Sequence, residues 1–295
     1  MNEHLFNRKI GITIFRTVMG VLILKDFMSF YFNRRFLFSD EGIVSYELYL
    51  DIINYYNIDW LYIDFNKSVI IKVFCFSGII LSTSFMLGIL TRISAILLFF
   101  LLFIFKIRAI YLLDGSDNVI SVMIPFFIFI DSYSLIDSYE RFSLNIKNKV
   151  QPYLNIASHY FVIAMMLQVC IIYFFASMHK LQGEYWREGS ALYYILNNDD
   201  FSASFLNKIL TESTLLIKFM TWFAIAFQFS FSFLVLFKKT KMKILLLGVL
   251  FHTGIFILMR IDNFSIMMLA CYSIFLTDNE YAKLFKKVIP IKHAN

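Results

Sequence analysis

The chain has 295 residues, of which 59% are hydrophobic and only 16% are charged, and phenylalanine alone fills 36 positions. A soluble domain of this length carries more charge and fewer aromatic residues, so the composition excludes an ordinary soluble domain and indicates an integral membrane protein. The net charge of +6 is explained by membrane topology and by attraction to anionic lipid, and it requires no nucleic-acid partner.

Eight apolar stretches follow one another along the chain. A hydrocarbon core of about 30 Å is crossed by a helix of about 20 apolar residues. We therefore predict an all-α, polytopic transmembrane bundle of about eight spans, which forms a single domain over residues 1–295. The predicted spans are residues 10–32, 69–87, 93–113, 119–136, 157–178, 215–237, 243–259 and 264–277.

Two of these stretches need separate comment. The first contains Arg16, Lys25 and Asp26 and precedes no small-residue cleavage pattern, so we expect it to stay attached rather than to be removed as a signal peptide. The last two, residues 243–259 and 264–277, are short and joined only by RIDN. They fit either two tilted helices or one re-entrant pair.

The basic residues predict the orientation. With the N-terminus placed in the cytoplasm, twice as many lysines and arginines fall on the inner side as on the outer side. The bias is strongest in the short loop KKTKMK, where the positive-inside rule is most reliable. We expect a multi-pass protein of the plasma membrane with both termini cytoplasmic, with residues 40–64 and 184–198 external. The stretch EYAKLFKKVI would then form a helix at the inner membrane surface.

The stretch YFFASMHKLQGEYWREGSALYYIL, residues 173–196, leaves the fifth span with a dense group of polar and aromatic residues. One interpretation is an interfacial belt, with aromatic rings at the depth of the lipid headgroups and solvated charges. The other is a site that contacts a substrate. The residues in question are His179, Lys180, Glu184, Trp186 and Glu188.

Several ionisable residues fall at similar depths in the outer halves of the spans. A charge at the bilayer centre costs at least about 2.5 kcal/mol, so such groups usually face a bundle interior or a watery cavity. The sequence therefore predicts an outward-facing polar cavity. Its members are Lys25, Asp26, Lys106, Arg108, Asp114, Lys180 and His252.

Most members of this cavity have a second interpretation. The long aliphatic stems of Lys25, Lys106 and Arg108 allow these side chains to reach the membrane interface instead. His252 lies within an apolar helix and could simply form a hydrogen bond with a neighbouring helix. The sequence leaves both interpretations open for each residue.

Five segments occur in an order that resembles the HTTM superfamily, the transmembrane module shared with vitamin K-dependent γ-glutamyl carboxylases. They are FRTVMG, LGILTRIS, IRAIYLLDGSDNVISVMIPFFIFIDS, YFFASMHKLQGEYWREGSALYYIL and LGVLFHTGIFILMRIDNFSIMMLACYSIFL. Within this superfamily the chain most resembles the sporulation-delaying protein B (SdpB) family. The shared features are length, the acidic DG loop, the W-x-E-G-x-A-x-Y-Y run and the LFH-x-G-I helix. The resemblance covers nearly the whole chain and implies an HTTM-like fold.

The carboxylase side of the resemblance implies a catalytic base. In those enzymes a lysine at the exit of the corresponding helix deprotonates vitamin K hydroquinone, and FFASMHKL places Lys180 at that position. A lysine acts as a base only when desolvation or nearby cations lower its pKa. The chain ends at Asn295, so we expect it to lack the large extramembrane region with which carboxylases hold glutamate-rich peptides. Peptide carboxylation is therefore disfavoured.

The SdpB side implies a membrane component of a small operon that makes a secreted antimicrobial peptide. Such a component acts with a small soluble partner to convert a precursor peptide into the active toxin, so the implied partners are membrane lipids, that soluble protein and the precursor. We predict a maturation factor of this kind, and whether it performs chemistry or only holds the peptide stays open. The candidate acid–base residues are Lys180, His252 and His179. The candidate substrate-binding residues are Lys106, Arg108, Asp114, Glu184, Trp186 and Glu188.

Two other functional classes remain open. A carboxylase-like enzyme would need a lipid quinone as cofactor in a pocket between spans, and the sequence itself requires no cofactor. A non-catalytic immunity or transport factor is the other class, and transport is disfavoured because the sequence shows no internal repeat and no pair of Gly- or Pro-broken helices. Zinc motifs, nucleotide-binding loops and nucleophile elbows are not found in the sequence. The cysteines Cys75, Cys170 and Cys271 lack metal-ligand spacing, so no metal site is predicted.

Overall fold

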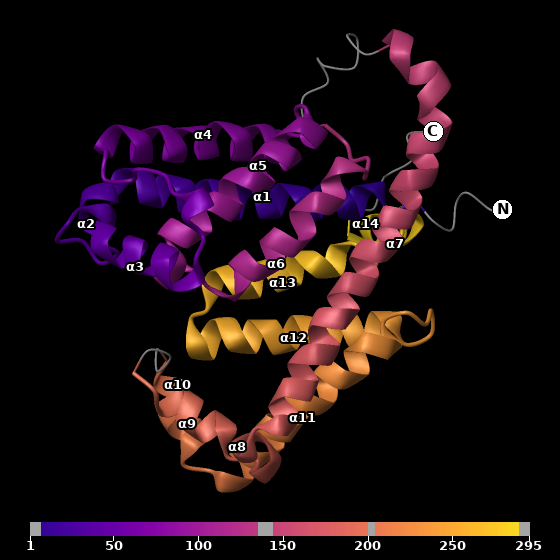
Figure 1. Cartoon of the computed structure of the whole chain (residues 1–295). Coiled ribbons are helices and arrows are strands. Elements are labelled where there is room, and N and C mark those ends of the chain that lie inside the picture. The colour runs from indigo at the N-terminus through magenta and orange to yellow at the C-terminus, as the bar shows by residue number, and fades with distance from the viewer. Residues whose placement is uncertain (1–6, 135–143, 200–203, 289–295) are drawn as a thin grey trace. The chain divides into compact units, whose positions relative to one another are not determined.

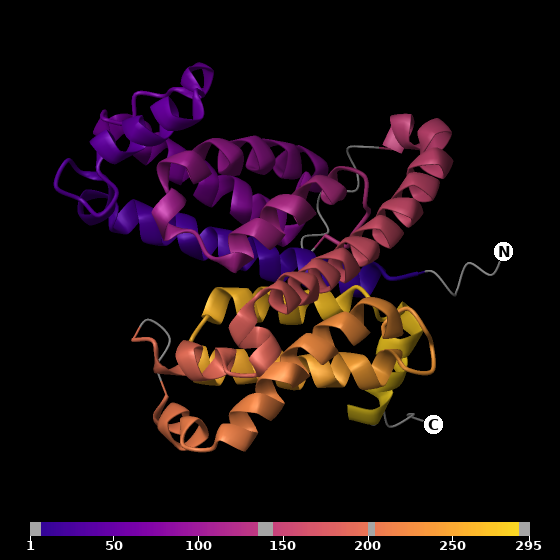
Figure 2. The same cartoon turned by 60° about the horizontal axis from the view of Figure 1, so that its bottom comes forward.

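The structure is a computed structural model that describes residues 7–134, 144–199 and 204–288 (Figures 1 and 2). Every regular element in these ranges is helical, and they contain no strand, so the all-α prediction is confirmed. The chain divides into two compact units. The first unit is Met1–Val162 with Leu276–Asn295, and the second unit is Ile163–Phe275.

In the first unit, α1 (Lys9–Phe32) packs along α4 (Ser68–Leu87), which in turn packs on α5 (Thr91–Arg108). Two glycines allow α1 and α4 to approach closely. A Cβ atom at Gly20 would lie 2.8 Å from the Cα atom of Met86, and one at Gly78 would lie 2.6 Å from a ring carbon of Phe27. Small residues at such contacts are the usual way in which membrane helices pack closely.

Residues between α1 and α4 form a folded segment rather than an open loop. It contains α2 (Arg34–Phe38), α3 (Tyr46–Tyr56) and the 3-10 turn η2 (Asp59–Leu61). The side chain of Ser45 accepts a hydrogen bond from Leu48 N and so caps α3, which packs against α5. The predicted external residues 40–64 therefore lie mostly within this small helical segment.

The segment after α5 differs from the prediction. It forms η3 (Ile110–Leu112), α6 (Gly115–Met123) and η4 (Ile124–Ile128), and α6 with η4 makes a shorter apolar helix than the predicted span over residues 119–136. Pro125 explains why the α-helix stops, because proline has no N–H to continue the hydrogen-bond ladder. Residues 135 and 136 of the predicted span lie outside the described residues.

The first unit also contains α14 (Asp278–Val288), which packs against the start of α1. Ile10 N donates a hydrogen bond to Asp278 Oδ1 at 3.0 Å, and Asp278 N donates to Asn7 O at 2.9 Å. This helix corresponds to the predicted interfacial stretch EYAKLFKKVI. Its Phe285 ring is exposed, as a helix at a membrane surface requires, whereas Tyr281 is buried.

The second unit begins within the long helix α7 (Leu144–Gln182), which starts in the first unit. Three further long elements follow, and α12 packs on both α11 and α13. Three short helices lie between α7 and α11. The bounds are α8 (Glu184–Glu188), α9 (Ala191–Asn197), α10 (Phe205–Thr211), α11 (Thr214–Leu234), α12 (Lys241–Met259) and α13 (Asp262–Ser273).

Four of the described helices are long and apolar enough to cross a membrane. They are Ser68–Leu87, Tyr153–Gln182, Thr214–Leu234 and Lys241–Met259. These helices support a membrane protein, but they do not confirm the predicted eight spans. The last predicted span is the clearest difference, because α13 has 12 residues and extends about 18 Å, less than the thickness of the hydrocarbon core.

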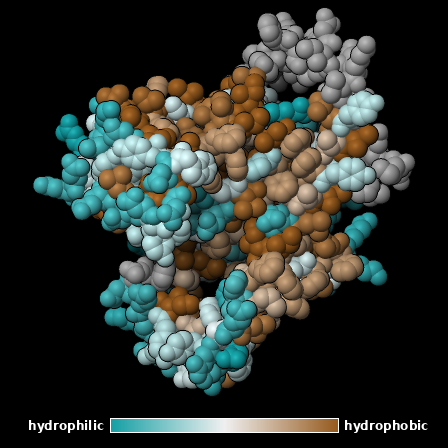
Figure 3. Space-filling model, viewed as in Figure 1, coloured by the Kyte–Doolittle hydropathy of each residue, from teal (hydrophilic) through white to brown (hydrophobic). Residues whose placement is uncertain are grey.

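The apolar surface of the helices agrees with a lipid environment. On α4, the side chains of Val73, Phe76 and Ile80 are each more than half exposed and follow one another at helical spacing. Figure 3 shows hydrophobic residues over wide areas of the visible surface, with hydrophilic residues gathered elsewhere. A contiguous apolar surface of this kind is stable in contact with lipid and unstable in water.

Candidate functional site

The exit of α7 brings two of the predicted site residues together. The Nζ atom of Lys180 lies 5.1 Å from the centre of the Trp186 ring. A cation at this distance from an indole face is attracted by the ring electrons. Lys180 is half-buried against this ring, whereas His179 beside it is exposed. The structure therefore pairs Lys180 with Trp186 and leaves His179 at the surface.

A tight turn holds α8 in place after this exit. Gly189 ends α8 at φ 81°, and a Cβ atom there would lie 3.1 Å from both Lys218 and Trp222 on α11. Trp222 Nε1 donates a hydrogen bond to Arg187 O at 3.1 Å. The glycine of the E-G pair is thus needed for its backbone conformation and for the close packing of α8 on α11.

The exposed faces of α8 and α9 carry acidic and aromatic side chains. Glu184 and Glu188 are exposed and form no ion pair among the described residues. Tyr185 and Tyr194 are about half exposed, and their rings lie 4.7 Å apart. This surface suits an interfacial belt, because tyrosines are typical of a membrane interface. It also suits a site that contacts a substrate, because exposed carboxylates can bind cationic groups.

A buried chain of three polar groups lies in the interior of the second unit. Tyr173 on α7 places its Oη atom 2.7 Å from His252 Nε2 on α12 and 2.5 Å from Tyr272 Oη on α13. His252 and Tyr173 are each 1% exposed, and Tyr272 is 5% exposed. The Nδ1 atom of His252 has no hydrogen-bond partner among the described residues.

One glycine and several aromatic rings position the three hydrogen-bonded groups of this buried Tyr–His–Tyr chain. A Cβ atom at Gly248, one turn before His252, would lie 2.6 Å from Tyr272 Cζ, so the glycine makes room for the phenol against α12. The ring centres of Tyr173 and Phe231 lie 4.2 Å apart. The ring centres of Phe251 and Phe264 lie 5.1 and 5.7 Å from that of His252. The three polar groups are therefore enclosed by apolar side chains, where hydrogen bonds are strong and unpaired groups are costly.

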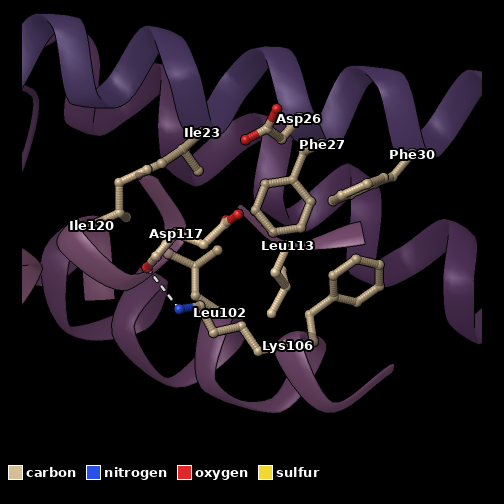
Figure 4. A pocket seen from close by; sticks show the side chains of 10 residues that line it. Ile23, Asp26, Phe27, Phe30, Leu102, Lys106, Leu113, Asp117 and Ile120 are labelled. Carbon is tan, nitrogen blue, oxygen red and sulfur yellow. Dashed lines mark hydrogen bonds between the residues drawn. The ribbon is translucent and has the colours of Figure 1, made fainter. Parts of the chain in front are cut away.

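The first unit contains a separate recess near the end of α5 (Figure 4). Lys106 Nζ donates to the backbone oxygen of Asp117 at 2.6 Å, and Asp117 Oδ2 accepts from Asp114 N at 2.8 Å. Asp114 in turn caps α6 by accepting a hydrogen bond from Ser116 N. Both Lys106 and Asp114 thus have structural partners. The remaining lining of the recess is mostly apolar and consists of Ile23, Phe27, Phe30, Leu102, Phe105, Leu113 and Ile120, with Asp26 among them.

Arg108 is fully buried and anchors the folded segment between α1 and α4. Its two terminal nitrogens donate to Val44 O at 2.6 Å and to Phe38 O at 3.1 Å, and its guanidinium lies 4.8 Å from the Phe38 ring centre. A side chain held in this way stabilises the connection between α2 and α3. Its predicted contact with a substrate stays a prediction.

The predicted residues are divided between the two units. Lys25, Asp26, Lys106, Arg108 and Asp114 belong to the first, and Lys180, His179, His252, Glu184, Trp186 and Glu188 belong to the second. The single outward cavity drawn from both groups therefore stays a prediction. Within the second unit, two turns of α7, about 11 Å along its axis, separate Lys180 from Tyr173 of the buried chain.

Tyr173 and Tyr272 were not predicted as site residues. They are two of 17 tyrosines in the sequence, and nothing in their immediate neighbours distinguishes them. One signal was available, because a tyrosine hydroxyl in the middle of a predicted span needs a hydrogen-bond partner, and His252 was the polar group predicted at similar depth. Pairing the two would have led to the buried chain.

Comparison with known proteins identifies the family. The HTTM domain family matches residues 8–279, which is nearly the whole chain. The chain belongs to the HTTM domain family. This HTTM protein is also similar to the sporulation-delaying protein SdpB of Bacillus subtilis (strain 168), with 25% identity over 191 residues. That alignment covers 60% of this chain and 57% of the relative, so it spans little more than half of SdpB. No solved structure matches the chain.

The HTTM protein offers no obvious ligand set for a metal in the part of the chain that the structure describes. No group of three or more His, Cys, Asp or Glu residues gathers there as metal ligands. Cys75, Cys170 and Cys271 are each buried and free. Three groups of polar side chains among the described residues are candidates for a functional role: the Lys180 and Trp186 pair, the buried Tyr–His–Tyr chain and the recess beside Lys106.

Proposed function

We propose that this HTTM protein acts in the maturation of a secreted antimicrobial peptide, at the plasma membrane, as a protein with about eight spans and cytoplasmic termini. Its membership of the HTTM family and its similarity to SdpB support this proposal. The partners that we propose are membrane lipids, a precursor peptide and a small soluble protein from the same operon.

The observation that carries the proposal is the arrangement at the exit of α7. Lys180 lies against Trp186, and the exposed carboxylates of Glu184 and Glu188 lie on the helix that follows directly. Carboxylates can bind cationic groups of a peptide and the tyrosines of α8 and α9 can contact its apolar side chains, while Lys180 supplies a positive charge. A peptide that emerges beside the membrane would meet all three kinds of contact.

The main alternative is an enzyme that resembles the carboxylases and depends on a lipid quinone. In that case Lys180 would act as the base that deprotonates the hydroquinone form of the cofactor. A non-catalytic immunity factor is a further alternative. The half-buried position of Lys180 suits either a fixed charge or a base, and a substitution that keeps the charge but cannot lose a proton separates the two roles.

In a strain that lacks the gene, we expect Lys180→Ala to fail to restore the mature secreted peptide, because both proposed roles need the amine. Lys180→Arg should restore it if the residue supplies charge, since arginine keeps the charge, but not if it acts as a base, because guanidinium does not lose its proton. We favour the charge role. The measurement is mass spectrometry of the culture medium, with the amount of inserted protein determined in parallel.

Lys208→Ala on α10 serves as the matched control, because it removes an exposed lysine of the same unit that lies outside α7, α8 and α9. The control variant should restore the peptide fully. Full restoration by Lys180→Ala at normal protein levels would contradict both roles, and the exit of α7 would then be an interfacial belt. If the complete deletion leaves the secreted peptides unchanged, the proposed function itself is wrong.

The proposed orientation leads to a labelling prediction. Glu188 and Lys239 are both exposed, and the three native cysteines are buried. A single cysteine introduced at position 188 or 239 should therefore account for the labelling. In intact cells, an impermeant maleimide should label Glu188→Cys, which we place outside, but should label Lys239→Cys only after the membrane is opened. The reverse pattern would show that the orientation is inverted.

A further inference from the structure

We propose that Tyr173 and Tyr272 fix His252 as a hydrogen-bond donor through Nδ1, and that this N–H is a binding position for the carbonyl oxygen of an apolar ligand within the second unit. The inference rests on the proposed function only where that ligand is taken to be part of the peptide. The tautomer and the chemical class of the ligand are argued from the geometry together with the donor and acceptor strengths of the groups.

The first step is the direction of the two hydrogen bonds. Tyr173 Oη lies 2.7 Å from His252 Nε2, and Tyr272 Oη lies 2.5 Å from Tyr173 Oη. A phenol O–H is a stronger donor than the N–H of a neutral imidazole, and the unprotonated ring nitrogen is a stronger acceptor than a phenol oxygen. Tyr173 therefore donates to Nε2, and Tyr272 donates to Tyr173.

The second step is the proton on the other nitrogen. A neutral imidazole carries one N–H and one acceptor nitrogen, and the bond made by one nitrogen determines the state of the other. Because Nε2 of His252 accepts from Tyr173, the proton resides on Nδ1. That N–H is buried and has no partner among the described residues. A buried donor without an acceptor is costly, so the site favours a molecule that brings one.

The third step is the chemistry around the free donor. Phe251 and Phe264 lie beside the His252 ring, and the ring is enclosed by the helices that carry them. Apolar surroundings of this kind disfavour a charged ligand but accept a neutral carbonyl group on an apolar body. A single buried water molecule would satisfy the same donor and is the competing occupant.

The experiment measures the tautomer in the full-length protein purified in detergent and labelled with nitrogen-15 at histidine. The His252 signals are assigned by their loss in His252→Asn. We expect Nδ1 to be protonated and Nε2 to be unprotonated. Tyr173→Phe removes the donor to Nε2, so the fraction protonated at Nδ1 should fall several-fold. Tyr272→Phe is the matched comparison. It leaves Tyr173 able to donate, so Nδ1 should stay mostly protonated, but it removes the bond that orients the Tyr173 hydroxyl, so the His252 signals should shift.

The ligand class is tested with two probes of nearly the same shape. Acetophenone carries a carbonyl oxygen, and α-methylstyrene has a CH₂ group in its place. We expect acetophenone to shift the Nδ1–H signal of His252 in a saturable way, and α-methylstyrene to leave it unchanged. The Tyr173→Phe variant should lose most of the acetophenone response.

Several results would overturn the proposal. Protonation of Nε2 in the unaltered protein would show that the hydrogen bonds run in the opposite direction. Equal responses to the two probes would show apolar contact without recognition of the carbonyl, and no response to either would show that this donor does not bind a carbonyl ligand. Because these signals are read from the purified protein, they stay interpretable even if the deletion strain secretes its peptides normally.

Discussion

Gly78→Ala is expected to destabilise the first unit by about 1–3 kcal/mol, although alanine is the better helix former by about 1 kcal/mol. The added Cβ atom would lie 2.6 Å from a ring carbon of Phe27, well inside van der Waals contact. That ring is 1% exposed and its centre lies 5.7 Å from that of Phe105, so a displacement of the ring would disturb this buried aromatic contact. Overpacking of the crossing between α1 and α4 therefore outweighs the gain in helix propensity.

The free energy of unfolding, measured by denaturant titration in detergent, tests this expectation. Phe27→Leu combined with Gly78→Ala provides the control, because the smaller side chain relieves the overlap with the new methyl group. The double variant should be more stable than the sum of the two single effects predicts, which is the mark of a direct contact. A stabilising Gly78→Ala, or strictly additive effects, would show that α1 and α4 do not meet at this glycine.

Helices were the part of the fold that the sequence predicted well. Apolar stretches that correspond to α1, α4, α5, α11 and α12 all form helices close to their predicted bounds. The reason is physical, since a run of about 20 apolar residues can satisfy its backbone hydrogen bonds in lipid only as a helix. The number of spans was harder to predict from the sequence, because the length of a helix decides whether it crosses the membrane. Local features such as Pro125 shorten helices within apolar runs.

The candidate site shows a different limit of sequence reasoning. Similar depth in the membrane predicted that Lys106 and Arg108 share a cavity, but depth does not determine which way a side chain points around its helix. Lys106 bonds to Asp117 O, whereas Arg108 bonds to Val44 O and Phe38 O in the folded segment. These backbone acceptors carry no signal in the sequence, because every residue type offers the same carbonyl group.

His252 illustrates both the strength and the limit of the prediction. The sequence left two interpretations of this ionisable residue open, a polar cavity or a hydrogen bond to a neighbouring helix, since an unpaired polar group in lipid is costly. Its partner is Tyr173, about 80 positions before it in the chain, and Tyr173 in turn bonds to Tyr272, 20 positions after His252. Only the packing of α7 and α13 on α12 selects these two tyrosines, and a single sequence does not reveal that packing.

Gly248→Ala is expected to destabilise the second unit by about 1–3 kcal/mol and to break the buried chain. A Cβ atom at this position would lie 2.6 Å from Tyr272 Cζ, so Tyr272 must withdraw from α12 or the two helices must separate. Either movement removes the 2.5 Å contact between Tyr272 Oη and Tyr173 Oη. The free energy of unfolding and the nitrogen-15 signals of His252 should therefore both change in the purified protein.

Gly254→Ala is a matched control within α12, because a Cβ atom there would meet nothing within 4 Å. Helix propensity alone then applies, and this variant should be as stable as the unaltered protein or more stable by up to about 1 kcal/mol. Its His252 signals should stay unchanged. The difference between the two alanine variants isolates the contact with Tyr272, since both replace a glycine in one helix by the same residue. If Gly248→Ala proves as stable as Gly254→Ala and leaves the His252 signals unaltered, Tyr272 does not pack against α12 at this glycine, and the buried chain of Tyr173, His252 and Tyr272 is not formed as described.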